Sequence, residues 1–147
     1  MSARRPMLGP MLPKDAIAAE SARRGKSELI AGCIALLSGK PVDDALLLAL
    51  GGPHAAVVLE GDPRSQYWLR VWAARGLLWA WDDAATPALT KALGDEHWRV
   101  REMAAKVVAR NRVGAAFEAV QALRDDPVAR VAQAADRATR VLVTAGE

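Results

Sequence analysis

The chain has 147 residues, a length that suits one domain or a short stack of repeats rather than two full domains. Hydrophobic residues make up 52% of it, aromatic residues 5% and charged residues 25%, which is typical of a folded soluble protein and too apolar for a disordered one. A net charge of +3 permits an acidic partner, but a dedicated nucleic-acid-binding domain usually concentrates more positive charge than this.

The sequence carries no sign of secretion, membrane insertion or metal binding. Prolines and a glycine interrupt residues 6–13, and no run of about 18 apolar residues occurs anywhere. The single cysteine, Cys33, excludes an intramolecular disulfide and most cysteine-based metal sites. We therefore expect a cytoplasmic protein with no membrane span, no metal and no cofactor.

The beginning of the chain differs from the rest in composition and periodicity. Residues 1–13 are rich in Met, Pro and Arg without periodicity, which predicts a flexible N-terminal arm. From residue 14 to 147 the segments have helical spacing and no alternation typical of strands, so we expect one all-α domain. Within it, residues 14–52 are interpreted as divergent capping helices, over 15–24, 27–37 and 42–50.

The remaining residues repeat at a step of 31. Arg70 recurs as Arg101, and Asp95 recurs as Asp126. A fixed period of this length is typical of stacked units that cannot bury their apolar faces alone. Helix-breaking and capping residues divide the segment into three repeats, 53–82, 83–113 and 114–143. Each repeat is predicted to hold two helices, over 53–60 and 64–81, 83–93 and 96–112, and 114–124 and 128–143.

The middle repeat carries a pattern made of Ala88-Leu89, Leu93, Asp95, Val100-Arg101 and Ala104-Ala105. This pattern resembles a HEAT repeat, of the short type related to the phycobilisome-lyase HEAT-like group, and the likeness is best over residues 62–142. One departure is Ala132, which stands where Arg101 would recur. The resemblance implies a right-handed α-α superhelix, or α-solenoid, of about three to four helix pairs with an additional N-terminal helix. It also implies a bacterial-type scaffold whose second helices line a concave binding surface.

No arrangement typical of catalysis is present, so we expect no enzyme. His54 and His97 lie in different repeats without a metal-ligand spacing. The Asp-Asp pairs fall near predicted helix starts, where a carboxylate caps free N–H groups, and this favours a structural role. A relic lyase or glycosylase site near Asp82 or Asp83 is the enzymatic alternative.

The tryptophans are the unusual feature of the composition. Four of the five lie in one predicted helix of a chain that is otherwise almost free of aromatic residues. Trp72 aligns with core positions of the later repeats. Trp68, Val71, Arg75 and Trp79 instead align with Arg99, Glu102, Lys106 and Arg110, which predicts an aromatic stripe on a face that the later repeats leave charged and exposed.

Three interpretations of this stripe are open: a cover of N-terminal helices that makes it ordinary core, a partner site, or a homodimer contact. We predict a non-catalytic module that binds a protein or peptide, because Trp and Arg are enriched at binding hot spots. The predicted partner-binding residues are Trp68, Arg75, Trp79, Arg99, Lys106 and Arg110. The alternative is nucleic-acid binding, with stacking tryptophans and a basic stripe that also includes Arg130, Arg137 and Arg140.

Overall fold

The computed structural model describes residues 11–145 with the exception of residues 60 and 62. Over this part the chain forms α-helices and short 3-10 turns, and no β-strand, so the all-α prediction is confirmed. The helices of the N-terminal region are α1 (Pro13–Arg24), α2 (Lys26–Leu37), α3 (Asp44–Gly51) and α4 (Ala55–Leu59). The helices that follow are α5 (Tyr67–Trp79), α6 (Thr86–Ala92), α7 (Trp98–Asn111), α8 (Phe117–Ala122) and α9 (Ala129–Ala145).

Aspartates begin several of the helical segments. The carboxylates of Asp43, Asp82 and Asp126 each accept a hydrogen bond from a backbone N–H two or three residues further along the chain. These bonds satisfy N–H groups that a helix start leaves without an intrahelical partner. One member of each Asp-Asp pair thus has the capping role expected from the sequence.

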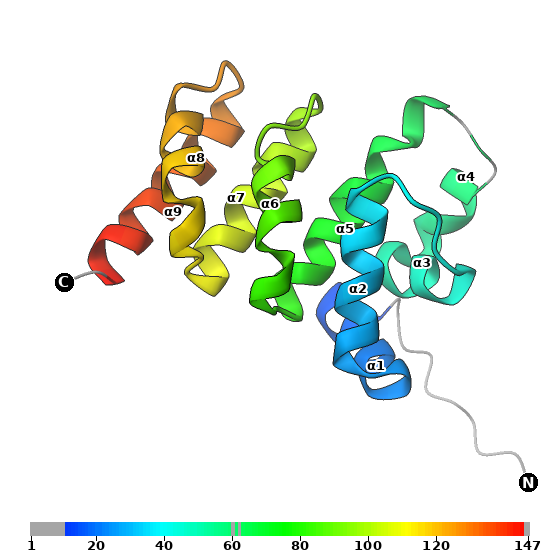
Figure 1. The fold of residues 1–147 in the computed structure, drawn as a ribbon. Helices are drawn as coiled ribbons and strands as arrows, with labels where there is room; N and C mark the ends of the chain where they lie inside the picture. The colour runs from blue at the N-terminus through cyan, green and yellow to red at the C-terminus, as the bar shows by residue number, and fades with distance from the viewer. Residues whose placement is uncertain (1–10, 60, 62, 146–147) are drawn as a thin grey trace, which may run out of the picture.

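The helices are arranged in two layers, as Figure 1 shows. α2, α6 and α8 form the outer layer, and α5, α7 and α9 form the inner layer in chain order. α5 packs against α2 and α7, α7 packs against α6 and α9, and α9 packs against α8. This stack of neighbours is an α-solenoid, and its core lies between the layers.

The first predicted repeat is built differently from the other two. α5 packs along α2, whereas α4, which the sequence pairs with it, packs chiefly against α3. α2 is long enough to cover α5, while α4 has only five residues. The division into repeats at residues 53, 83 and 114 stays a prediction.

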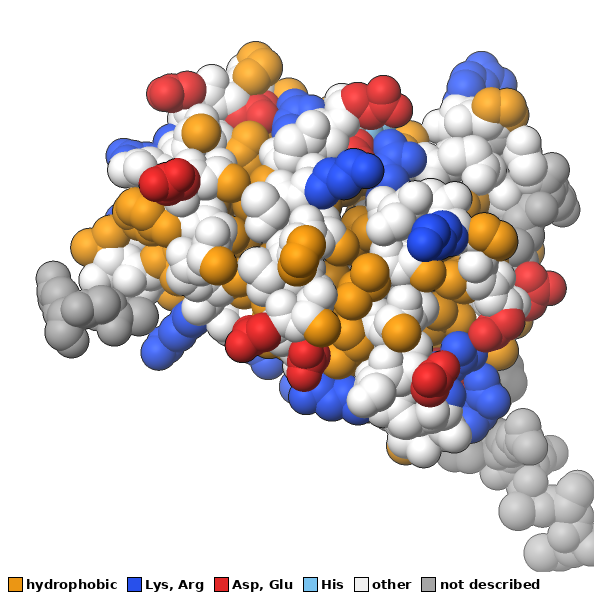
Figure 2. All heavy atoms as spheres, viewed as in Figure 1, with side chains coloured by type: hydrophobic (Ala, Val, Ile, Leu, Met, Phe, Trp, Pro, Cys, Tyr) orange, Lys and Arg blue, Asp and Glu red, His pale blue; other side chains and the backbone are white. Residues whose placement is uncertain are grey.

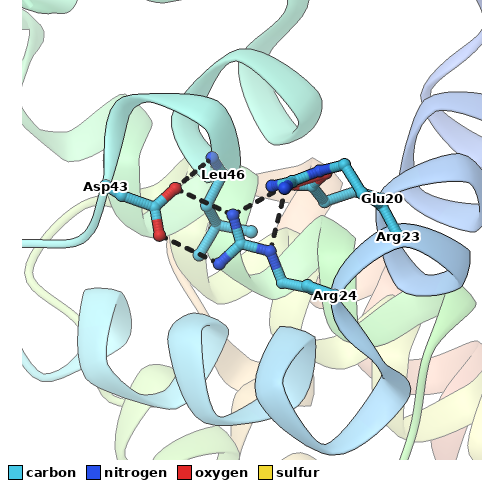
Figure 3. Close-up of polar contacts among 5 residues, drawn as sticks. All are labelled: Glu20, Arg23, Arg24, Asp43 and Leu46. Atoms are coloured by element: carbon cyan, nitrogen blue, oxygen red, sulfur yellow. Dashed lines mark hydrogen bonds and ion pairs between the residues drawn. The ribbon is translucent and has the colours of Figure 1, made fainter.

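The start of α1 lies over the inner layer, and its end is held against α3. α1 packs on α2, α3 and α5. The Arg24 guanidinium donates to Glu20 on its own helix and to both oxygens of Asp43, which caps α3 (Figure 3). Glu20 is buried, and a buried carboxylate requires a nearby cation, which the Arg24 guanidinium provides. The predicted arm ends where α1 begins, at Pro13, and residues 1–10 lie outside the described residues.

Candidate functional site

Two arginine–aspartate pairs join successive helices of the inner layer. Arg70 Nε lies 2.7 Å from Asp95 Oδ2, and Arg101 Nε lies 2.8 Å from Asp126 Oδ2. Each aspartate also accepts a backbone N–H at the start of the next helix segment, from His97 or Val128. The four side chains are therefore occupied in holding the stack together, and we assign them no role in binding.

The stripe predicted from the tryptophans is only partly exposed. Val71 is 5% exposed and its equivalent Glu102 is 8% exposed, so the prediction that this face is open is wrong at these two positions. Adjacent inner-layer helices pack side by side, and this covers the seam between them. Trp68, Arg75 and Trp79 are half-buried, whereas Trp72 belongs to the core as predicted.

Cations of the same chain lie against the half-buried tryptophan rings. The Arg99 guanidinium carbon is 5.2 Å from the Trp68 ring centroid and 4.5 Å from that of Trp98. Arg110 approaches the Trp79 ring at 4.6 Å, and Lys14 of α1 approaches the same ring at 5.5 Å. Such contacts contribute about 0.5–1 kcal/mol each at exposed sites. The rings are thus already engaged by side chains of the same chain.

A groove of about 670 Å³ runs between the C-terminal half of α5, α7 and α9. We call it the inner groove. Its apolar lining comes from Leu78, Trp79, Ala109, Ala134 and Val141. Its charged lining is one carboxylate, Glu102, and five cations, Lys106, Arg110, Arg112, Arg130 and Arg137. The excess of positive charge is complementary to that of an anionic partner, so the groove is a candidate site.

Glu102 anchors part of this positive charge. Its carboxylate lies 2.9 Å from Arg130 Nε and 4.0 Å from Lys106 Nζ, and its side chain is 11% exposed. Arg110, Arg112 and Arg137 form no ion pair with any other described residue. These three exposed guanidinium groups are the strongest candidates for contacts with an anion.

The outer layer offers no comparable concentration of charge. Figure 2 shows the face formed by α2, α6 and α8, on which acidic and basic side chains are scattered among hydrophobic ones. A surface of mixed charges is the ordinary solvated exterior of a folded domain. The inner layer is therefore the side on which we place the candidate site.

Two of the predicted site residues line a separate cavity. Trp68 and Arg75 lie on a pocket of about 550 Å³, which we call the α1–α3–α5 pocket. It shares no lining residue with the inner groove. The predicted binding residues thus fall at different places. The inner groove is lined by Trp79, Lys106 and Arg110, and the pocket by Trp68 and Arg75. Arg99 packs between the rings of Trp68 and Trp98.

Arg75 is held inside this pocket by the C-terminal end of α3. Its Nη2 donates to the Leu50 carbonyl oxygen, while its buried Nε has no hydrogen-bond partner. Burial lowers the pKa of the Arg75 guanidinium, since removal from water disfavours its charged form. An arginine keeps its charge in proteins nonetheless, so the pocket contains a cation for which no described residue supplies a counter-ion.

Several contributors to these surfaces were not identified from the sequence. Lys14 of α1 reaches Trp79, and Met11 and Pro13 line the α1–α3–α5 pocket. Arg112, which lines the groove, ends α7 with a φ of 49°, a left-handed conformation uncommon outside glycine. No sequence signal points to these residues, because their positions follow from how α1 folds back and how α7 ends.

The histidines and the cysteine have structural surroundings. His97 caps α7 and stacks on the Tyr67 ring at a centroid distance of 3.5 Å. Burial and the nearby Arg99 lower the pKa of His97. Cys33 is fully buried, and this burial raises the pKa of its thiol to about 12. Over the described part of the chain, no cluster of His, Cys, Asp or Glu is suited to hold a metal ion.

The family model for HEAT repeats matches residues 53–140, which is more than half of the chain. The chain therefore belongs to the HEAT repeat family, whose members commonly mediate protein interactions. Comparisons with curated proteins and with solved structures gave no match. None of the helices described by the structure is long and apolar enough to cross a membrane. The phycobilisome-lyase-like type, the cytoplasmic location and the bacterial-type source stay predictions.

Proposed function

We propose that this HEAT repeat protein is a non-catalytic module that binds an acidic segment of a partner protein in the inner groove. The observation that carries the proposal is the composition of that groove, in which five cations and one carboxylate surround apolar side chains. Trp79, Lys106 and Arg110 are the predicted binding residues that line it, whereas Arg99 lies on α7 against the rings of Trp68 and Trp98.

The cation–π contacts support recognition of carboxylates. When a guanidinium lies against an aromatic ring, its N–H groups in the guanidinium plane remain available for hydrogen bonds. Arg110 beside Trp79 is positioned in this way, with an exposed side chain. Such a cation can pair with a glutamate or aspartate of the partner, while Leu78, Ala109 and Val141 provide contacts for the partner's apolar side chains.

The surroundings of the tryptophans favour a protein partner over a nucleic acid. Base recognition by stacking requires open ring faces, but Trp68 and Trp98 each contact Arg99, and Trp79 contacts both Arg110 and Lys14. A phosphate backbone also carries no apolar groups that could pack against the apolar lining of the groove. Nucleic acid is therefore an outcome of the test below rather than the proposal.

The test compares two variants with the same change in net charge. Arg110→Glu/Arg137→Glu removes the net positive charge of the groove, and Lys26→Glu/Lys40→Glu makes the same change in charge at exposed sites on and after α2. Each protein is used to capture partners from native lysate, with and without nuclease, after its helicity has been checked. Wild type and the α2 variant should capture the same protein, and the groove variant should capture at least tenfold less.

Three outcomes would contradict the proposal. Capture that survives in the groove variant would show that the groove is not the site. Capture that nuclease abolishes, together with a steep loss of affinity for labelled DNA or RNA as salt rises, would indicate nucleic-acid binding. Self-association that sedimentation detects in wild type but not in the groove variant would identify a second copy of this chain as the occupant.

A further inference from the structure

The α1–α3–α5 pocket is an apolar chamber of the size of small-molecule sites. Its volume of about 550 Å³ lies within the range of about 300–1,000 Å³ that such sites occupy. Leu50, Val58, Trp68 and Trp72 contribute apolar side chains, and Met11 lies at its border with the start of α1. Among the described residues, none that lines it is acidic.

Arg75 is the charged group of this chamber. It forms no ion pair with any described residue, and its one hydrogen bond runs from Nη2 to the Leu50 carbonyl oxygen. Nε is buried without a partner, and it is the single such side-chain atom in the part of the chain that is described. A half-buried cation for which the described residues supply no counter-ion is costly, because protein groups do not replace the water that its buried Nε has lost.

We propose that the α1–α3–α5 pocket binds a small organic carboxylate with an apolar body, and that Arg75 neutralises the carboxylate. The apolar body occupies the space beside Trp68, Val58 and Met11. Inorganic anions fit poorly, since they lack an apolar body to replace water along these walls. The proposal does not rest on the function proposed for the inner groove, because the two cavities have no residue in common.

The test uses four compounds and the intact chain, and two of the compounds, decanoate and decanol, share the same alkyl chain. Decanoate and 4-phenylbutyrate carry the carboxylate, decanol lacks the charge, and sulfate lacks the apolar body. Isothermal titration calorimetry should show saturable binding of one molecule per chain for at least one of the carboxylates. Decanol should bind at least tenfold more weakly than decanoate, because a hydrogen bond to a charged partner is worth roughly tenfold or more in affinity.

Two variants locate the site. Arg75→Met removes the charge and keeps an apolar side chain, so it should fold at least as stably as wild type while it binds the carboxylate at least tenfold more weakly. Ala16→Phe keeps Arg75 and places a ring in the pocket, so it should also lose binding. Arg112→Met, on the inner groove, serves as the matched control and should bind the carboxylate as wild type does.

The proposal is overturned if neither carboxylate binds saturably, if decanol binds as tightly as decanoate, or if Arg75→Met retains wild-type affinity. Arg110→Glu/Arg137→Glu should leave carboxylate binding intact, and Arg75→Met should leave capture of the protein partner intact. Failure of one proposal is thus distinguishable from failure of the other.

Discussion

Gly76 lies where α5 packs closely against both α2 and α3. A Cβ atom built on Gly76 of α5 would lie 2.6 Å from Cys33 Sγ of α2 and 2.8 Å from Leu50 Cδ2 of α3. Both distances are shorter than van der Waals contact, so a side chain here would push two helices away from α5. Because residue 76 has no side chain, α5 can pack closely against α2 and α3.

Gly76→Ala should therefore lower the free energy of unfolding by about 1–3 kcal/mol, measured by urea denaturation. The expected direction opposes helix propensity, which by itself favours Ala over Gly by about 1 kcal/mol within a helix. Overpacking against Cys33 and Leu50 outweighs this gain.

Two further variants test the cause. Gly94→Ala, where the added Cβ would lie 3.6 Å from the Lys91 carbonyl oxygen, an ordinary van der Waals contact, should leave stability unchanged or raise it by up to about 1 kcal/mol. Cys33→Ala combined with Gly76→Ala should recover part of the loss, since it removes the closest atom. A Gly76→Ala variant as stable as wild type would show that α2 and α3 can shift at little cost.

Residue environments were predicted best where the repeat alignment gave each position several equivalents. Trp72 aligns with Met103 and Ala134, and it is 4% exposed. The same alignment failed for Val71 and Glu102, because exposure there depends on how neighbouring helices cover the seam rather than on the face of a single helix. Glu102 is buried beneath Lys106 and Arg130, which a charge pattern alone does not reveal.

At the scale of the helices, the arginine–aspartate pairs connect one repeat to the next. Arg101 on α7 donates to Asp126, and it also donates to the backbone carbonyls of Asp95 and Glu96. Burial raises the pKa of Asp126, but the Arg101 bonds and the Val128 N–H lower it more, so the net shift is downward. The series ends at α9, where Ala132 replaces the arginine.

Asp126→Asn should lower the free energy of unfolding at pH 7 by about 1–3 kcal/mol, because Arg101 is left without its counter-ion. The pH dependence follows from the lowered pKa of Asp126. Its contribution is complete above the unfolded-state pKa of about 3.9 and is lost as the pH falls through the lower folded-state value. The difference between wild type and Asp126→Asn should therefore shrink below about pH 4.

Asp136→Asn is the control for this measurement. Asp136 pairs with Arg124 and Arg140, whose side chains are 48% and 76% exposed, so the substitution should cost less than about 1 kcal/mol. Equal losses for the two variants would mean that the pair between repeats contributes no more than a surface ion pair.

The helices themselves were predicted more accurately than their partners. Capping residues and the 31-residue step placed the inner-layer helices within a few residues of α5, α7 and α9. The sequence pairs α5 with the segment 53–60, but the principal outer-layer contact of α5 is α2. Local signals define where a helix begins and ends, whereas the choice of neighbour depends on the apolar area that each helix offers, and α4 is too short to offer much.

The candidate site was predicted in part, for a related reason. The repeat positions brought Trp79, Lys106 and Arg110 to one groove, as a regular stack of helices requires. Trp68 and Arg75 went to a separate pocket because α1 folds back across α5, and α1 has no counterpart in the repeats from which its position could be inferred.

The whole molecule is a one-dimensional stack of helices, so the region that a destabilising substitution unfolds should depend on the position of that substitution in the stack. Among the described residues α9 packs on α7, α8 and the 3-10 turn Leu123–Asp125 and has no neighbour on its other side, whereas α7 is packed on both sides, by α5 and α9. In such a stack, stability is approximately a sum of local terms and neighbour interfaces, so the end can open while the rest stays folded.

Val131→Ala and Val107→Ala remove the same two methyl groups from fully buried positions, the first on α9 and the second on α7. Each should cost about 1–3 kcal/mol at its own site. In native-state hydrogen exchange, Val131→Ala should speed exchange at least tenfold in α8 and α9 and leave α2 and α5 near wild-type rates. Val107→Ala should instead speed exchange in both α5 and α9, because both depend on α7. If Val131→Ala accelerates exchange in α2 and α5 by the same factor as in α9, the stack unfolds as one cooperative unit and the one-dimensional description of it is wrong.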